Sequence, residues 1–204
     1  MRYSFILVML ALCSLFFSFQ EKEKSILFYG DSITAGYGLA PEQAFPHLVG
    51  LYFTERGKNI KVINAGLSGE TSAGGLSRID WVLRQPVDIF ILELGANDGL
   101  RGLPVEETIK NLQQIIDKVK LKYPQAKIVL AGMMVPPNMG LEYSDKFQKI
   151  YPELAAKNKA TLIPFLLEGV AGDQSLNLPD GIHPNAKGHQ KVAQHIIDIL
   201  RPML

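Results

Sequence analysis

Short apolar runs alternate with longer amphipathic stretches along most of this chain. The short runs are typical of buried strands, whereas the longer stretches carry apolar side chains at the spacing of a helix. The clearest helical stretch covers residues 105–121, where Ile109, Leu112 and Ile116 fall on one face and Pro104 is predicted to be the first helical residue. We predict strands at residues 25–29, 60–64, 87–94, 127–133 and 161–164, and helices at residues 43–56, 76–84, 105–121, 145–157 and 185–200.

This order of elements constrains the fold class. Strands joined by helices form right-handed crossovers, which produce a parallel sheet covered on both faces. The sequence therefore predicts a three-layer α/β/α sandwich with a five-stranded parallel sheet of the flavodoxin-like kind. In such folds, ligands bind beyond the carboxyl ends of the strands.

Composition is consistent with one domain over residues 25–204. The chain has 204 residues, of which 47% are apolar and 20% are charged, which is ordinary for a globular protein with a full core. The formal net charge of +1 indicates no polyanionic partner such as nucleic acid.

The first 24 residues are not expected to belong to this fold. Arg2 precedes an apolar run over residues 3–19, and a polar stretch follows from Gln20. A basic start, an apolar middle and a polar exit are typical of an export signal, which would place the protein in the periplasm or at a membrane facing outward. An uncleaved N-terminal membrane anchor is one alternative, because the run is just long enough for a membrane span. A buried first helix is the other, but it is disfavoured because the run lacks polar positions at helical spacing.

The single cysteine, Cys13, lies in the same run. Residues 10–13 resemble a bacterial lipoprotein cleavage box, so lipidation of Cys13 is a further alternative, although Leu12 stands where a small residue is expected. The domain from residue 25 onward contains no cysteine, so it can have neither a disulfide nor a thiol nucleophile.

Ser32 follows the first predicted strand, within Gly30-Asp31-Ser32-Ile33. A serine hydroxyl becomes a nucleophile when a neighbouring base removes its proton. The alternatives are a serine that caps the next helix or closes a turn, and a glycine-rich phosphate cradle. The second alternative lacks the Lys-Ser/Thr pair that a nucleotide-binding loop requires.

His183 and Asp180 lie three residues apart, just before the last predicted helix. This spacing lets one short loop present both side chains, with the carboxylate orienting the imidazole as a general base. A lone histidine in this place is otherwise a cap or a surface residue. A zinc site is disfavoured, because His189 and His195 follow at six-residue steps and cannot share one helix face.

Asn97 follows the strong predicted strand at residues 87–94, within Gly95-Ala96-Asn97-Asp98. Its amide could donate a hydrogen bond to a tetrahedral oxyanion, or it could be an ordinary turn residue. Gly69, after the second predicted strand, could offer a second donor through its backbone N–H, which no side chain obstructs.

In their order along the chain, these four segments resemble the blocks of the SGNH (GDSL) hydrolase family. The resemblance covers about residues 25–203. Within the family, the residues of these segments are most similar to those of bacterial periplasmic thioesterases, lysophospholipases and arylesterases. It implies that Ser32 is the nucleophile, that His183 is the base and that Asp180 is its partner. It also implies an oxyanion hole formed by the N–H groups of Ser32 and Gly69 with the Asn97 amide.

The expected activity is hydrolysis of carboxylic esters or thioesters through an acyl-enzyme on Ser32. Acyl thioesters, lysophospholipids and aryl esters are the substrates that the resemblance implies, so the expected partner is a small ester or lipid. The expected chemistry needs no metal or cofactor. A carbohydrate O-deacetylase and a non-catalytic binding module are the alternatives. The common α/β-hydrolase layout is disfavoured, because the chain contains no Gly-x-Ser-x-Gly and the acid lies close to the histidine.

Overall fold

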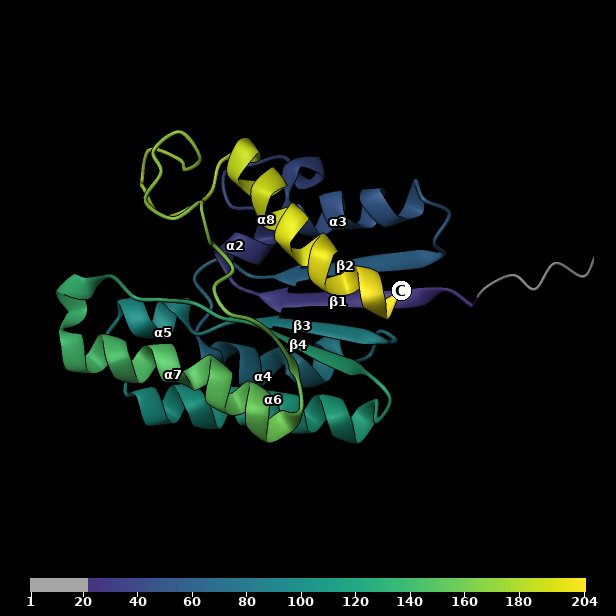
Figure 1. The fold of residues 1–204 in the computed structure, drawn as a ribbon. Coiled ribbons are helices and arrows are strands. Elements are labelled where there is room, and N and C mark those ends of the chain that lie inside the picture. Colours follow the sequence, from purple (N-terminus) through teal and green to yellow (C-terminus); the bar gives the residue numbers. More distant parts are fainter. Residues whose placement is uncertain (1–21) are drawn as a thin grey trace, which may run out of the picture.

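The computed structural model describes residues 22–204, which form a five-stranded parallel sheet between two layers of helices (Figure 1). The strand order is β2-β1-β3-β4-β5, which is the flavodoxin-like order that the sequence predicts. The strands are β1 (Lys24–Gly30), β2 (Ile60–Gly66), β3 (Ile89–Glu93), β4 (Lys127–Ala131) and β5 (Thr161–Ile163).

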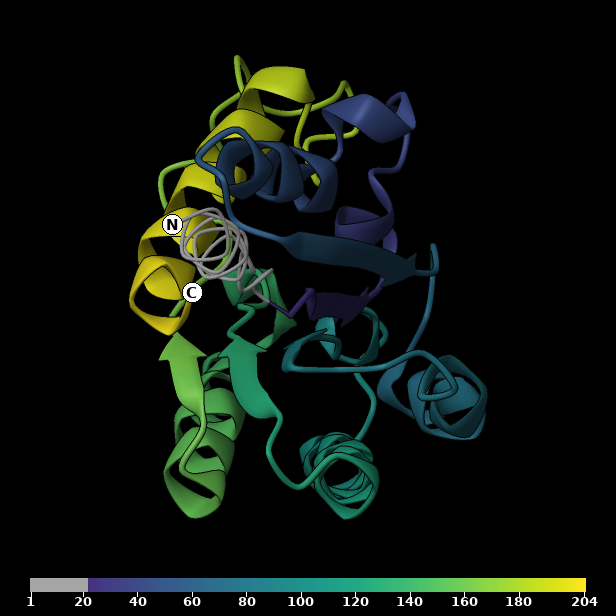
Figure 2. The ribbon, with the colours of Figure 1, turned by 90° about the vertical axis from the view of Figure 1, so that its right-hand side faces the viewer.

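Helices cover both faces of this sheet, as the end-on view in Figure 2 shows. Helices α3 (Phe45–Thr54) and α8 (Ala186–Leu200) pack against each other on one face. Helices α4 (Ser72–Val82), α6 (Val105–Lys122) and α7 (Leu141–Asn158) form the other layer, in which α6 contacts both neighbours. The remaining helical segments are short, namely α2 (Ser32–Ala35), α5 (Ala96–Leu100), η2 (Pro41–Gln43), η3 (Pro137–Met139) and η4 (Arg201–Met203).

The core lies around the two central strands. All residues of β3 are buried, and β1 is buried from Ser25 onward, whereas β2 at the sheet edge is only partly covered. This explains why β1 and β3 read as continuous apolar runs rather than as alternating patterns. The strand order switches between β1 and β3, because β2 lies on one side of β1 whereas β3, β4 and β5 follow on the other side. Such a switch point is where ligands bind in open α/β sheets.

Several helix boundaries differ from the prediction. Helix α4 begins at Ser72 rather than at residue 76, because the Thr71 hydroxyl accepts a hydrogen bond from Gly74 N and caps the helix. Helix α7 begins at Leu141 rather than at residue 145. Pro104 occupies the N-cap position, with extended backbone, so the first residue of α6 is Val105. The short helices α2 and α5 are too brief to leave a periodic signal.

Gly66, the last residue of β2, allows α2 to pack closely on the sheet. A Cβ at this position would lie 2.2 Å from Ala35 N and 2.7 Å from Ala35 Cα. Both are backbone atoms, which cannot move aside as a flexible side chain could. Glycine at this strand end therefore sets the distance between β2 and the helix that begins with Ser32.

No helix within residues 22–204 is long and apolar enough to cross a membrane. The export signal or anchor is predicted over residues 1–24. Of these, residues 1–21, which include Cys13, lie outside the part of the chain that the structure describes. The role of this segment is therefore still a prediction.

Candidate active site

Ser32 lies at the carboxyl end of β1, as the first residue of helix α2. The side chain of Asp31 caps this helix by accepting a hydrogen bond from Ile33 N at 3.0 Å. Gly36 ends the helix after one turn in the left-handed conformation, with φ of 78°. The sharp turn places a largely buried Ser32 side chain at the rim of the sheet.

Ser32, His183 and Asp180 meet in one hydrogen-bonded chain. The Ser32 Oγ lies 2.8 Å from His183 Nε2, and His183 Nδ1 lies 2.7 Å from Asp180 Oδ2. The structure thus brings Ser32 to the Asp180–His183 pair, although Ser32 and His183 are 151 positions apart in the sequence. A carboxylate that accepts the Nδ1 proton leaves the lone pair on Nε2, which can then accept the serine proton.

Asp180 is held by its own loop. Its Oδ1 accepts hydrogen bonds from His183 N at 3.0 Å and from Ile182 N at 2.9 Å. These backbone donors, above all His183 N, lower the pKa of Asp180 to about 2, and the hydrogen bond to the His183 ring adds to the effect. Asp180 is therefore ionised at any pH at which the imidazole can act as a base.

Tyr37, which the sequence analysis did not single out, supports the imidazole from one side. Its ring centroid lies 4.6 Å from that of His183, with the two planes tilted by 40°. Tyr37 follows helix α2 after Gly36, and its N–H donates to the Ser32 carbonyl at 3.0 Å, so the turn that carries Ser32 also restricts the orientation of His183.

Asn97 lies in the first turn of α5, at the carboxyl end of β3. Its Nδ2 donates to Asp31 Oδ2 at 3.0 Å, which holds the amide beside the residue that precedes Ser32. An amide nitrogen has two N–H groups, so this contact leaves one donor for a ligand. The structure therefore brings the mid-chain block to the turn after β1, as the sequence predicts.

Gly69 lies in the turn between β2 and α4, with φ of 78°, a conformation that favours glycine. Its carbonyl accepts a hydrogen bond from Arg101 at 3.0 Å. The end of this turn is clamped by Asp98, whose carboxylate accepts from Ser72 N at 2.8 Å and from Ser72 Oγ at 2.5 Å. Asp98 and Arg101 thus attach the Gly69 turn to the segment that carries Asn97.

An apolar cavity of about 430 Å³ opens beside these residues. It reaches the sequence neighbours of Ser32, Asn97 and His183, because Ile33, Ala96 and Ile182 are part of its wall. The remaining wall consists of Leu100, Met133, Met134, Val135, Pro136, Phe165, Leu167, Ala171, Gly172 and Gly181. Such a wall suits a hydrocarbon chain.

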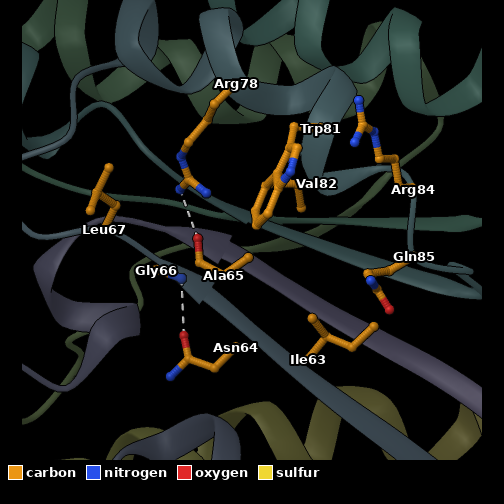
Figure 3. A pocket seen from close by; sticks show the side chains of 10 residues that line it. All are labelled: Ile63, Asn64, Ala65, Gly66, Leu67, Arg78, Trp81, Val82, Arg84 and Gln85. Atoms are coloured by element: carbon orange, nitrogen blue, oxygen red, sulfur yellow. Dashed lines mark hydrogen bonds between the residues drawn. The ribbon is translucent and has the colours of Figure 1, made fainter.

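A larger cavity of about 540 Å³ lies elsewhere, along the edge strand β2 (Figure 3). Arg78 and Trp81 from α4 line it together with Leu67 at the end of β2, and Arg78 donates to the Ala65 carbonyl. None of the predicted site residues lines this groove. We therefore place the candidate site at the smaller cavity.

His189, which the sequence analysis weighed as a metal ligand, has a structural contact. Its Nδ1 accepts a hydrogen bond from Phe45 N at 3.1 Å, and its ring stacks on that of Phe45. Burial lowers the pKa of His189 to about 4, so the ring is neutral and can accept this bond. The histidine satisfies the first backbone N–H of helix α3.

Residues 28–191 match the sequence profile described as the GDSL-like lipase/acylhydrolase family. The chain belongs to this family. The match spans most of the described fold, and its members include enzymes of the ester-hydrolysing type described below. The resemblance noted in the sequence is therefore confirmed.

Related proteins agree with this assignment. This GDSL enzyme is 37% identical to "Esterase TesA" of Pseudomonas aeruginosa over 91% of its own length and 92% of the relative. It is 39% identical to "Arylesterase" of Vibrio mimicus, over 87% and 88% of the two chains. It is 35% identical to "Thioesterase 1/protease 1/lysophospholipase L1" of Escherichia coli, over 88% and 85%.

Solved structures lead to the same conclusion. The crystal structure of TesA has a TM-score of 0.84 at 37% identity and covers 89% of this chain and 100% of its own. AlinE4, an esterase of the SGNH-hydrolase family, has a TM-score of 0.74 at 40% identity, over 90% and 97% of the two chains. This GDSL protein is therefore an ester-hydrolysing enzyme with the SGNH-hydrolase fold.

Proposed function

We propose that this esterase acts through Ser32 as a covalent nucleophile, with His183 as general base and Asp180 as its orienting carboxylate. The observation that carries the proposal is the unbroken hydrogen-bonded chain from Asp180 through His183 to Ser32. A serine in a turn or cap needs no imidazole at 2.8 Å, whereas a nucleophile does. This contact therefore favours catalysis over a purely structural role for Ser32.

In the first step, Ser32 Oγ attacks the ester carbonyl carbon while His183 Nε2 takes the hydroxyl proton. The carbonyl oxygen becomes an oxyanion, which the Asn97 amide and the N–H groups of Ser32 and Gly69 stabilise. The protonated His183 gives its proton to the departing alcohol or thiol, and an acyl-enzyme remains. Water then attacks the acyl-enzyme by the same route, which releases the acid and restores Ser32.

The cavity of about 430 Å³ is proposed to hold the acyl chain. Its apolar wall begins at Ile33, next to the nucleophile, so an acyl carbonyl at Ser32 would send its chain into the cavity. We therefore favour acyl esters and thioesters with an extended hydrocarbon chain, including the aryl ester, thioester and lysophospholipid substrates that the names of the relatives indicate.

An acyl-length series of p-nitrophenyl esters tests this assignment. We expect kcat/KM to rise from acetate to medium-chain esters by up to about fourfold per added CH₂, because each buried CH₂ contributes about 0.8 kcal/mol. Ala171→Phe should partly fill the cavity and lower kcat/KM for the longer esters, with acetate changed less than about twofold. Gln85→Phe in the separate β2 groove is the matched control and should leave the series unchanged.

A flat series would remove the support for an acyl cavity. Faster release of acetate from acetylated xylan than hydrolysis of any p-nitrophenyl ester would favour the carbohydrate O-deacetylase instead. Loss of activity in Gln85→Phe to the same degree as in Ala171→Phe would show that the effect comes from the fold rather than from the cavity.

We further propose that residues 1–24 direct export and that residues 25–204 form the enzyme domain. The support is the apolar run of residues 3–19, after which β1 begins at Lys24. Fractionation of expressing cells should find esterase activity in the periplasm or on the membrane, and replacing Leu7 and Leu10 by Arg should leave the activity in the cytoplasm. Unchanged distribution in the double variant would contradict export by this segment.

A further inference from the structure

Glu93, the last residue of β3, is a buried carboxyl group to which the proposed mechanism gives no role. Its Oε2 accepts hydrogen bonds from Asp31 N at 3.1 Å and from the Thr34 hydroxyl at 2.7 Å. Its Oε1 is buried and has no hydrogen-bond partner within the described residues. A carboxyl group that is half satisfied in a core requires an explanation, because burying it is costly.

Asp31, which donates its backbone N–H to Glu93, is buried as well. Its Oδ1 accepts from Ile33 N at 3.0 Å, and its Oδ2 accepts from the Asn97 amide at 3.0 Å. Asp31 therefore joins the turn that carries Ser32 to the side chain proposed as an oxyanion donor. The backbone N–H of Asp31 donates to Glu93, so Glu93 holds the residue that makes this connection.

The two carboxyl groups cannot both be ionised at low cost. Neither takes part in an ion pair within residues 22–204. Two carboxylates that share a buried site without a cation keep one proton between them. Asp31 has donors on both oxygens and Glu93 on only one, so the charge belongs on Asp31 and the proton on Glu93.

The pKa shifts of Asp31 and Glu93 agree with a proton on Glu93 and a charge on Asp31. Burial raises the pKa of Asp31 to about 6. Burial and the neighbouring charge of Asp31 raise the pKa of Glu93 well above its usual range. The other titratable groups nearby are Tyr151 from α7, which burial keeps neutral, and His183, whose charge when protonated lowers the pKa of Asp31.

We propose that Glu93 is a positioning residue of this esterase, a neutral carboxylic acid that fixes the charged Asp31, which in turn directs the Asn97 amide at the oxyanion. The inference rests on the proposed function, because it requires Asn97 as a donor. Gly30 is an independent sign of how closely these groups are packed. A Cβ at Gly30 would lie 2.3 Å from Glu93 Oε2 and 2.2 Å from Thr34 Oγ1.

Two substitutions at Glu93 separate positioning from packing. Glu93→Gln keeps the shape and the neutral charge, and its amide oxygen can still accept the hydrogen bond from Asp31 N. Glu93→Met keeps the length of the side chain but removes both oxygens. We expect Glu93→Gln to retain kcat within about threefold and Glu93→Met to lose about tenfold or more in kcat with KM little changed, since a misdirected oxyanion donor acts on the transition state.

Thr34→Val is the matched control. It removes the other hydrogen bond to Glu93 Oε2 in the same buried cluster, but it leaves the contact between Glu93 and Asp31 N. Its kcat should stay within about threefold of wild type, even if its thermal midpoint falls as far as that of Glu93→Met. Equal losses of kcat in Thr34→Val and Glu93→Met would overturn the positioning role.

The pH profile tests where the proton lies, and it does not depend on whether Glu93→Met folds. Protonation of Asp31 would weaken the hydrogen bonds that its carboxylate accepts from Ile33 N and the Asn97 amide, so kcat/KM should fall as the pH drops through about 6. If Glu93 is neutral, the acidic limb of the kcat/KM profile, where activity falls with falling pH, should lie at the same pH in Glu93→Gln as in wild type. An ionised Glu93 would instead raise the pKa of Asp31, and Glu93→Gln would then move the limb to lower pH by about one unit.

A shifted acid limb, or wild-type kcat in a folded Glu93→Met, would overturn the proposal. Failure of the proposed function itself gives a different result, because the Ser32→Ala variant would then remain active in the same assay.

Discussion

Ser32→Ala is expected to lower kcat/KM for p-nitrophenyl butyrate by at least about a thousandfold. The substitution removes the oxygen that lies 2.8 Å from His183 Nε2, and no other hydroxyl is recorded in contact with that nitrogen among the described residues. The activity that remains would come from the oxyanion donors and from binding of the substrate. Steady-state kinetics on the purified variant would measure the loss.

The thermal midpoint of Ser32→Ala should stay close to that of wild type, because the recorded side-chain hydrogen bond of Ser32 is the one to His183. A fluorophosphonate probe, which reacts with activated serines, should label wild type and fail to label the variant. Ser77→Ala is the matched control, since Ser77 is on α4 and its hydroxyl donates only to the Gly74 carbonyl. Labelling of Ser32→Ala at the wild-type rate would contradict the assignment of the nucleophile.

The fold was predictable because its signals are local. The central strands are continuous apolar runs, the helices α6 and α8 have a strong amphipathic period, and their alternation leaves few topologies. The helix ends were less accurate because caps decide them. Thr71 extends α4 backward by several residues, and nothing in the apolar pattern of that stretch indicates it.

The candidate site was predictable only in part. The blocks around Ser32, Asn97 and His183 could be found because each follows a strand or precedes a helix, and such ends meet at one edge of a parallel sheet. The tertiary partners could not be found in this way. Asp98 clamps Ser72, and Tyr37 packs on His183, through contacts that no spacing encodes.

Glu93 is the exception, because the sequence did contain a signal. The strand predicted at residues 87–94 contains two charged residues, and of these Asp88 lies near its start whereas Glu93 follows the apolar run from Ile89 to Leu92. A carboxyl group in a strand that is buried on both faces requires partners. The sequence could have indicated a buried polar contact there, but not that its partner is the aspartate before the nucleophile.

Asp180→Asn is expected to lower kcat by about a hundredfold to ten-thousandfold, although the change is nearly isosteric. Two backbone N–H groups, from Ile182 and His183, point at Oδ1 of Asp180. The asparagine carbonyl oxygen must take that position, because an amide nitrogen cannot accept these bonds. The amide nitrogen then faces His183 Nδ1 and donates to it, which moves the ring proton to Nε2 and leaves no lone pair for the Ser32 proton.

Asp180→Ala is the informative comparison, because it removes the orienting group without imposing the wrong tautomer. We therefore expect Asp180→Asn to be at least as damaging to kcat as Asp180→Ala, with KM little changed in both. His183→Ala, which removes the base itself, sets the lower limit of activity in the same assay. An Asp180→Asn variant clearly more active than Asp180→Ala would mean that the loop can turn the amide. The fixed backbone donors at Oδ1 would then not control the protonation of the imidazole.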